Sequence, residues 1–272
     1  TREDRQAAHR WLGEWFEGIE LTLNIAQERV HQWQSAGDMD KLRECLLEQN
    51  VFKELHEHDE YALLGHWLQL GEDVEKAYAE AWENWPEQDV LAFQLGSFLQ
   101  SSGFYGEFTE QLLRRALAAK EKELGPEHPD TLISVSSLGT LLDKKGNYAG
   151  AEELCRRALA GREKALGPEH LSTLTSVNNL GVMLKAKGDS ASAEELYRRA
   201  LEGKEKALGA SHPSTLVSVS NLGQLLWQKG DYTEAEELCH RALAGRETAL
   251  GLEHPDTLTS VNNLGVMLKA KG

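Results

Sequence analysis

The chain has 272 residues, of which 40% are apolar and 27% charged, as is typical of a globular protein. Lys and Arg number 29 against 44 Asp and Glu, and the formal net charge of −15 argues against a nucleic-acid binder, which needs a basic face. No stretch approaches about 18 consecutive apolar residues, so we expect no membrane-spanning segment.

The cysteines indicate the cellular compartment, and the first residue bears on the extent of the protein. Cys45, Cys155 and Cys239 are odd in number and form no CxxC pair, which favours a reduced, cytoplasmic protein. No signal peptide precedes Thr1, so we interpret the chain as part of a longer protein.

Residues 1–90 carry most of the negative charge and show no regular repeat. They contain 8 Lys and Arg against 21 Asp and Glu, whereas residues 91–272 contain 21 against 23. Six of the seven tryptophans lie in 1–90, and Trp11 and Trp15 belong to a stripe at helical spacing that we expect to be core. We predict an irregular helical linker or capping segment here.

The rest of the chain repeats every 42 residues. Residues 173–188 recur without change as 257–272, and the period is marked by Gly125, Gly167, Gly209 and Gly251. A degenerate copy precedes the regular ones. We therefore predict a degenerate repeat over 91–124 and a regular array over 125–272, whose last repeat ends after its first helix.

Each unit of the array contains two amphipathic helices. The first follows Pro129 or its equivalent, because proline is well placed in a first helical turn. The second runs from near Tyr148 to Leu166, and the small residues Gly139 and Ala151 allow the two helices to cross closely. A hairpin of this kind cannot bury its own apolar face, so hairpins stack. The fold class predicted is all-α.

The pattern resembles the tetratricopeptide repeat, and its 42-residue period with LGPEHPDTL at 124–132 resembles the kinesin light chain subclass. The residues that match the repeat signature are Leu138, Gly139, Leu142, Ala151, Cys155 and Ala158. The resemblance implies a right-handed superhelical solenoid of helix–turn–helix repeats. It also implies a concave groove, lined by the first helices, that binds a protein or peptide.

Counting from the signature Leu and Gly places four groove positions in each first helix. The predicted groove residues are Ile133, Ser136, Thr140, Asp143, Thr175, Asn178, Val182, Lys185, Val217, Ser220, Gln224, Trp227, Thr259, Asn262, Val266 and Lys269. Trp227 is the single tryptophan of the regular repeats. It is either an anchor for a partner or a packing residue of the solenoid.

Polar residues that recur in every repeat are candidates for reactive groups. The histidines at 128, 170, 212 and 254 stand one repeat apart, too far to share a metal ion, and we expect them to hydrogen-bond at helix starts. Glutamates of the second helices precede arginines by four residues, which predicts ion pairs such as Glu153–Arg157 and Glu237–Arg241. No phosphate-binding GxxxxGK[ST] occurs. We expect no catalytic, metal-binding or cofactor-binding residues, no cofactor and no small-molecule substrate.

The N-terminal segment is similar to the helical stretch that precedes the repeats in nephrocystin-type STAND NTPases. The similarity lies in HRWLGEWF at 9–16, the run at 34–55 and YALLGHWLQLG at 61–71. It implies the ligand-sensing arm of a STAND-type signalling NTPase whose nucleotide site lies outside this chain. The alternative is a cargo or scaffold adaptor resembling kinesin light chain, with no NTPase attached.

Overall fold

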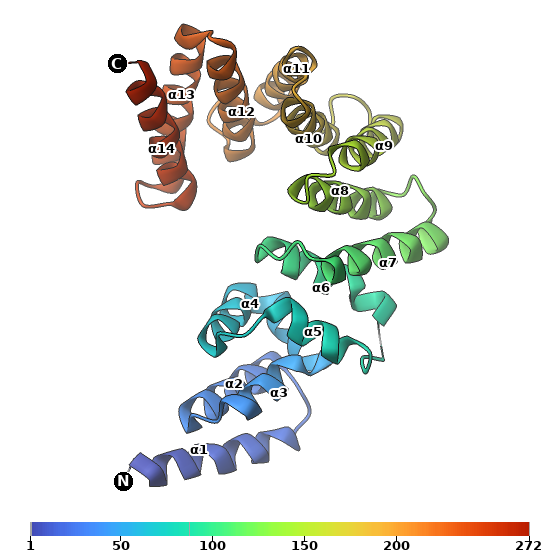
Figure 1. The fold of residues 1–272 in the computed structure, drawn as a ribbon, viewed down its shortest axis with the longest axis vertical. Helices are drawn as coiled ribbons and strands as arrows, with labels where there is room; N and C mark the ends of the chain where they lie inside the picture. The colour runs from blue at the N-terminus through green and yellow to red at the C-terminus, as the bar shows by residue number, and fades with distance from the viewer. Residues whose placement is uncertain (1, 87, 272) are drawn as a thin grey trace. The chain divides into compact units, whose positions relative to one another are not determined.

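The computed structural model describes residues 2–86 and 88–271, and every regular element within them is a helix (Figure 1). The all-α prediction is confirmed. The helices are α1 (Arg2–Glu17), α2 (Leu23–Ala36), α3 (Met39–Leu47), α4 (Gln49–Leu70), α5 (Val74–Trp82), α6 (Gln88–Ser101), α7 (Glu107–Leu124), α8 (Pro129–Lys144), α9 (Tyr148–Leu166), α10 (Leu171–Lys187), α11 (Ser190–Leu208), α12 (Pro213–Lys229), α13 (Tyr232–Leu250) and α14 (Pro255–Lys271).

The chain divides into two compact units, residues 1–119 and 120–272. In the second unit, α8 pairs with α9, α10 with α11, and α12 with α13. Each second helix also packs on the first helix of the next pair, and α14 packs on α12 and α13, as the yellow-green to red helices of Figure 1 show. This unit is a solenoid of helical hairpins. The predicted division into a linker or capping segment (1–90), a degenerate repeat (91–124) and a regular array (125–272) stays a prediction.

The first helices of the array begin with the same cap. A histidine Nδ1 accepts a hydrogen bond from the backbone N–H two residues further along, at 3.1–3.2 Å, in each of His128, His170, His212 and His254. The predicted role of these histidines at the helix starts is confirmed. The second helix begins at Tyr148, as expected.

The helices of a hairpin approach closely because a glycine stands where they cross. A Cβ added to Gly139 would lie 3.5 Å from the sulfur of Cys155 and 3.6 Å from the carbonyl oxygen of Ala151. At Gly181 it would lie 2.7 Å from the ring of Tyr197, a distance that real Cβ atoms do not show. The close crossing expected from small residues is confirmed, and at Gly181 only glycine fits.

Basic side chains near the ends of the second helices are buried, and within the described residues they bond to neutral oxygens instead of carboxylates. Arg162, Lys204 and Arg246, spaced 42 residues apart, are the members of this set, which we call the buried cations. The Lys204 ammonium lies 3.3 Å from the carbonyl oxygen of Ser214. An Arg246 guanidinium nitrogen lies 3.3 Å from that of Asp256. Burial lowers the pKa of Lys204, and neutral oxygens solvate the charge.

Arg162 shows how the buried cations join neighbouring hairpins. From α9 it donates to the carbonyl oxygen of Leu132 in α8 at 3.3 Å and to the hydroxyl of Ser176 in α10. The hydroxyl of Thr173 donates to the carbonyl oxygen of Gly167 at 2.8 Å and closes the loop between α9 and α10. The hydrogen bonds of Arg162 and Thr173 thus link the three successive helices α8, α9 and α10.

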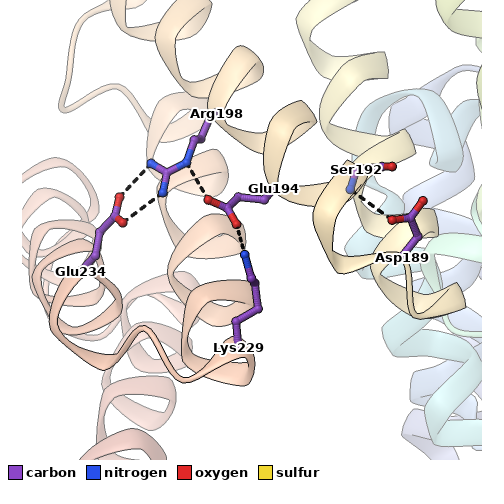
Figure 2. A network of polar contacts seen from close by, with 6 residues as sticks. All are labelled: Asp189, Ser192, Glu194, Arg198, Lys229 and Glu234. Atoms are coloured by element: carbon purple, nitrogen blue, oxygen red, sulfur yellow. Dashed lines mark hydrogen bonds and ion pairs between the residues drawn. The ribbon is translucent and has the colours of Figure 1, made fainter.

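Ion pairs on the surface add a second link between repeats (Figure 2). Glu194 in α11 accepts hydrogen bonds from Lys229 at the end of α12 and, at 2.9 Å, from Arg198. Arg198 also donates to both oxygens of Glu234 in α13, at 2.8 and 3.0 Å. The hydrogen bond from Lys229, followed by that from Arg198, lowers the pKa of Glu194.

The expected pairing of a glutamate with the arginine four residues on is confirmed at Glu152–Arg156 and Glu194–Arg198, but it is wrong at Glu153–Arg157 and Glu237–Arg241. Arg157 lies 2.5 Å from a carboxylate oxygen of Glu121, and Arg241 lies 2.5 Å from one of Glu205. Each arginine therefore reaches back to the preceding repeat instead of along its own helix. Stacking brings the carboxylate of the neighbouring second helix within reach, which a single-helix argument could not show.

The first unit is built around aromatic side chains. Phe52 packs against the rings of Tyr78, Trp85 and Phe98, with centroids 5.4–5.9 Å apart. The indole of Trp67 donates to the Tyr78 hydroxyl at 3.1 Å, which donates in turn to a backbone carbonyl of α3 at 3.2 Å. This core extends from α2 to α7, so helices of the acidic segment pack on α6 and α7.

Two tryptophans of this unit lie outside the core, contrary to expectation. Trp11 is 63% exposed and Trp15 is 54% exposed. Helix α1 instead turns Gly13 toward α2, where an added Cβ would lie 2.7 Å from the indole of Trp33. The predicted buried stripe is therefore wrong at Trp11 and Trp15, because α1 docks through a glycine.

We predict that Arg162→Ala lowers the free energy of unfolding by about 2–3 kcal/mol, because charged donors contribute about 1.5–3 kcal/mol and their buried acceptors lose a partner. Arg156→Ala is the matched control in the same helix. It removes an exposed arginine that pairs with Glu152 at 2.8 Å and should cost less than about 1 kcal/mol. Urea unfolding followed by circular dichroism measures both, and equal losses would contradict a special role for Arg162.

We predict a loss of stability in acid that depends on Glu194. Because its pKa in the folded chain lies below the ordinary value of 4.5, its ion pairs stabilise the fold fully above pH 4.5. That contribution disappears as the pH falls through the lowered pKa. Glu194→Gln should lower the urea midpoint at pH 7 and flatten its dependence on pH below 4.5. An unchanged pH dependence would show that these pairs contribute nothing.

Candidate functional site

The sixteen predicted groove residues lie on α8, α10, α12 and α14, the first helices of the array, and differ in accessibility. Eight are exposed: Ile133, Thr140, Thr175, Val217, Thr259, Asn262, Val266 and Lys269. Seven are half-buried: Ser136, Asp143, Val182, Lys185, Ser220, Gln224 and Trp227. Asn178 is buried.

The hydroxyl groups of this surface bond to their own helices. Ser136 donates to the carbonyl oxygen of Leu132 at 2.9 Å, and Thr140 donates to that of Ser136 at 3.1 Å. Thr175 and Thr259 do the same with the carbonyl four residues before them, both at 2.9 Å. With the proton engaged, each hydroxyl offers a ligand an acceptor oxygen.

Asn178 joins two repeats. Its side chain is 5% exposed, and its Oδ1 accepts hydrogen bonds from the hydroxyl of Ser218 at 3.3 Å and the amide of Asn221 at 3.1 Å, both in α12. The side chain carbonyl is thus used within the fold, between α10 and α12.

Lys185 and Gln224 also meet across this boundary. The Lys185 ammonium lies 3.5 Å from Oε1 of Gln224, and burial lowers the pKa of Lys185. A carboxylate placed beside Lys185 by a ligand would stabilise its charge.

Trp227 lines an open recess between α12 and α14. Three of the predicted residues, Gln224, Trp227 and Val266, line this recess, together with Gln228, Asn263 and Met267. The Trp227 ring stands 4.6 Å from that of Tyr232 and packs against the core formed by Cys239, Leu264 and Met267. One edge of the indole is therefore fixed by the fold while the recess remains open to a ligand.

The cysteines are buried thiols in the described structure. Burial raises the pKa of Cys45 to about 12 and that of Cys155 to about 11, which disfavours the reactive thiolate. Cys239 lies 3.4 Å from the sulfur of Met267. Cys155 and Cys239 face the crossing glycines of α8 and α12, so their position in the repeat reflects packing.

The described residues contain neither a metal-binding cluster nor a membrane-spanning helix. No group of three or more His, Cys, Asp or Glu side chains is arranged to hold a metal ion. Among the helices described, none is both long and apolar enough to cross a membrane.

The tetratricopeptide repeat models match residues 89–164, 136–206 and 215–256, more than half of the chain. The chain belongs to the tetratricopeptide repeat (TPR) family. Nephrocystin-3 is a relative with 38% identity over 146 residues in Xenopus tropicalis and 38% over 156 residues in Homo sapiens. These matches span 48% of this chain but only 11–12% of the length of nephrocystin-3.

Solved TPR-like structures share the fold at low sequence identity. A Podosopora anserina structure, titled as a kinesin light chain with nearly identical TPR-like repeats, is 24% identical with a TM-score of 0.53 and covers 84% of this chain and 95% of its own. BtubC (BKLC) from P. vanneervenii is 17% identical with a TM-score of 0.54 and 94% coverage of both chains. A Rap protein complexed with Competence and Sporulation Factor is 14% identical, with a TM-score of 0.55 over 98% of this chain and 82% of that one.

We predict that Trp227→Ala lowers the free energy of unfolding by about 2 kcal/mol, less than a fully buried tryptophan, because one side of the ring is open. Val217→Ala, an exposed position on the same helix, should change it by less than about 0.5 kcal/mol. Urea unfolding measures both. A negligible effect of Trp227→Ala would mean that the indole does not contribute to packing.

Proposed function

We propose that the TPR array is a protein-recognition module that binds a protein or peptide on the surface formed by α8, α10, α12 and α14. TPR proteins bind protein or peptide partners, and this chain has their fold. The observation that carries the assignment to this surface is the recess around Trp227. Residues from two successive first helices meet there beside a half-buried indole.

The chemistry of the surface suits a peptide. Exposed Ile133, Val217 and Val266 offer apolar contacts, while hydroxyl oxygens, amides and the Lys185 ammonium supply acceptors and donors for backbone groups. A half-buried aromatic anchor can contribute about 2 kcal/mol or more to an interface. By contrast, the second helices present exposed ion pairs such as Lys206–Glu202, each worth less than about 1 kcal/mol.

We further propose that the chain is the ligand-sensing arm of a STAND-type signalling NTPase, with no catalytic residues of its own. Support comes from the similarity to nephrocystin-3 and from the order of the N-terminal segment and the repeats. Buried unpaired thiols suit a reduced, cytoplasmic location. The alternative, a cargo or scaffold adaptor without an NTPase, is favoured by the fold shared with the structure titled as a kinesin light chain.

The proposed binding surface can be tested with peptides selected against the chain. Phage-displayed random peptides are enriched on the immobilised protein, and the affinity of synthetic winners is measured by fluorescence anisotropy. Val217→Asp and Trp227→Ala should each weaken binding about tenfold or more, equivalent to about 1.4 kcal/mol. Lys206→Ala on α11 is the matched surface control and should leave affinity unchanged.

Val217→Asp carries the test because its side chain is exposed and the substitution leaves the core intact. Failure to enrich any peptide would contradict a peptide-binding module. Selected peptides that bind both first-helix variants normally but lose affinity to second-helix variants would place the site on α9, α11 and α13 instead.

A further inference from the structure

Helix α4 of the first unit presents apolar side chains to solvent along its second half. The helix bends at Asp59, whose side chain accepts a hydrogen bond from the backbone N–H of Ala62 at 3.0 Å and so caps that half. Tyr61 is 90% exposed and Leu68 is 71% exposed. These two residues and Gly65 stand at positions i, i+7 and i+4, on one side of the helix, and we call this surface the α4 face.

The neighbouring helices hold α4 on its other sides without covering this face. Gln69 bonds to Gln34 of α2, and Glu60 accepts a hydrogen bond from the hydroxyl of Ser101 in α6. Trp67 of α4 is fully buried in the core to which α3, α5 and α6 also contribute. The α4 face is therefore an exposed surface within a packed region of the fold, with helices before and after it in the same core.

Gly65 lies in this face without a contact that explains a glycine. A Cβ added to Gly13 or Gly96, two other helical glycines of the first unit, would lie 2.7 or 2.9 Å from a side chain of an opposing helix. At Gly65 the added Cβ meets no described atom within 4 Å beyond the adjoining helix backbone. A glycine inside a helix is less favourable than alanine, and no close packing offsets that loss here. It leaves a notch between Tyr61 and Leu68.

The chain around the α4 face is strongly acidic. Residues 54–75 contain seven Asp and Glu and no Lys or Arg. Glu57 and Glu72 are both exposed and lie four residues before Tyr61 and four after Leu68. Arg43 of α3 binds Glu72 at 2.7 Å, but the stretch itself supplies no cation to the other carboxylates. The apolar face thus lies in a negative field that favours a basic partner.

We propose that the α4 face docks an amphipathic helix of a partner protein, in which Lys or Arg residues flank an apolar stripe. The stripe contacts Tyr61 and Leu68, and one of its side chains enters the notch at Gly65, as a ridge of one helix enters a groove of another. The basic residues meet Glu57 and Glu72 at the two ends. A helix fits better than a strand, because the backbone of α4 has no free edge to pair with one.

The same charge makes a second copy of this chain a poor occupant. The chain carries a formal net charge of −15, and two α4 faces brought together would place like charges opposite each other. The α4 face also lies in the first unit, whereas the proposed peptide site lies on first helices of the second. This inference therefore does not rest on the proposed function.

The test is a selection of helical peptides against the 272-residue chain. A phage library of alanine-rich helices with randomised surface positions is enriched on the Val217→Asp variant, which disfavours binders of the proposed peptide site. We expect the enriched peptides to carry an apolar stripe and a net positive charge. Their affinity, measured by fluorescence anisotropy, should fall as NaCl rises from about 0.05 to 0.3 M, because salt screens the charge pairs.

Two variants locate the peptide on the α4 face. Leu68→Asp should weaken binding about tenfold or more, because it places a charge in the apolar contact. The matched control is Leu252→Asp, the same change at a leucine of the second unit that is 68% exposed, and it should leave affinity unchanged.

Gly65→Leu separates docking from folding. Its side chain extends into open space and leucine is a better helix former, so the variant should melt at or above the wild-type temperature. It should nevertheless weaken the selected peptides about tenfold or more, because the notch is filled.

Any of three results would overturn the proposal. The first is that no helical peptide binds with a dissociation constant below about 1 mM. The second is that the selected peptides are neutral or acidic, or that they bind Leu68→Asp and Gly65→Leu as tightly as the wild-type chain. The third is self-association of the chain that Leu68→Asp abolishes, which would make a second copy the occupant.

Discussion

The contact between a crossing glycine and the second helix of the same hairpin determines the architecture of the array. At Gly139, Gly181 and Gly223 the helix backbone meets a side chain of the opposing helix directly. The same close packing fully buries Leu174 of α10 against Gly203 of α11. We propose that the opposite side of each first helix faces a ligand.

The buried cations Arg162, Lys204 and Arg246 link neighbouring hairpins. The buried cations donate to carbonyl and hydroxyl oxygens, so the charge is solvated by the same groups that define the loop to the next helix. Removing such a group leaves buried acceptors without donors, which costs more than losing a surface ion pair. Surface pairs such as Glu194 with Lys229 reinforce the same boundaries from outside.

Much of the array could be predicted from its period. The helix starts at His128, the crossing at Gly139 and the second helix from Tyr148 follow from local rules that each 42-residue unit obeys. The first unit lacks this redundancy. The spacing of Trp11 and Trp15 predicts a buried stripe when α1 is considered alone. In the structure α1 contacts α2 through Gly13 instead, and both tryptophans are exposed.

Sequence patterns predict least about the side chains at which neighbouring repeats meet. Arg162 looks like an ordinary charge in a second helix, and Asn178 looks like a groove amide, yet both are buried because the next hairpin covers them. Two sequence features pointed to these buried roles. A basic residue recurs every 42 positions at Arg162, Lys204 and Arg246, and amide side chains recur on α10 and α12. Only the stacked geometry shows which of these side chains reach across a boundary.

The most direct measurement of the proposed function is a crystal structure of the chain bound to a peptide selected against it. Our account predicts a peptide lying on the first helices, with an apolar side chain in the recess beside Trp227 and polar contacts to Gln224 or Lys185. A peptide seated on α9, α11 and α13, with the recess unoccupied, would contradict it.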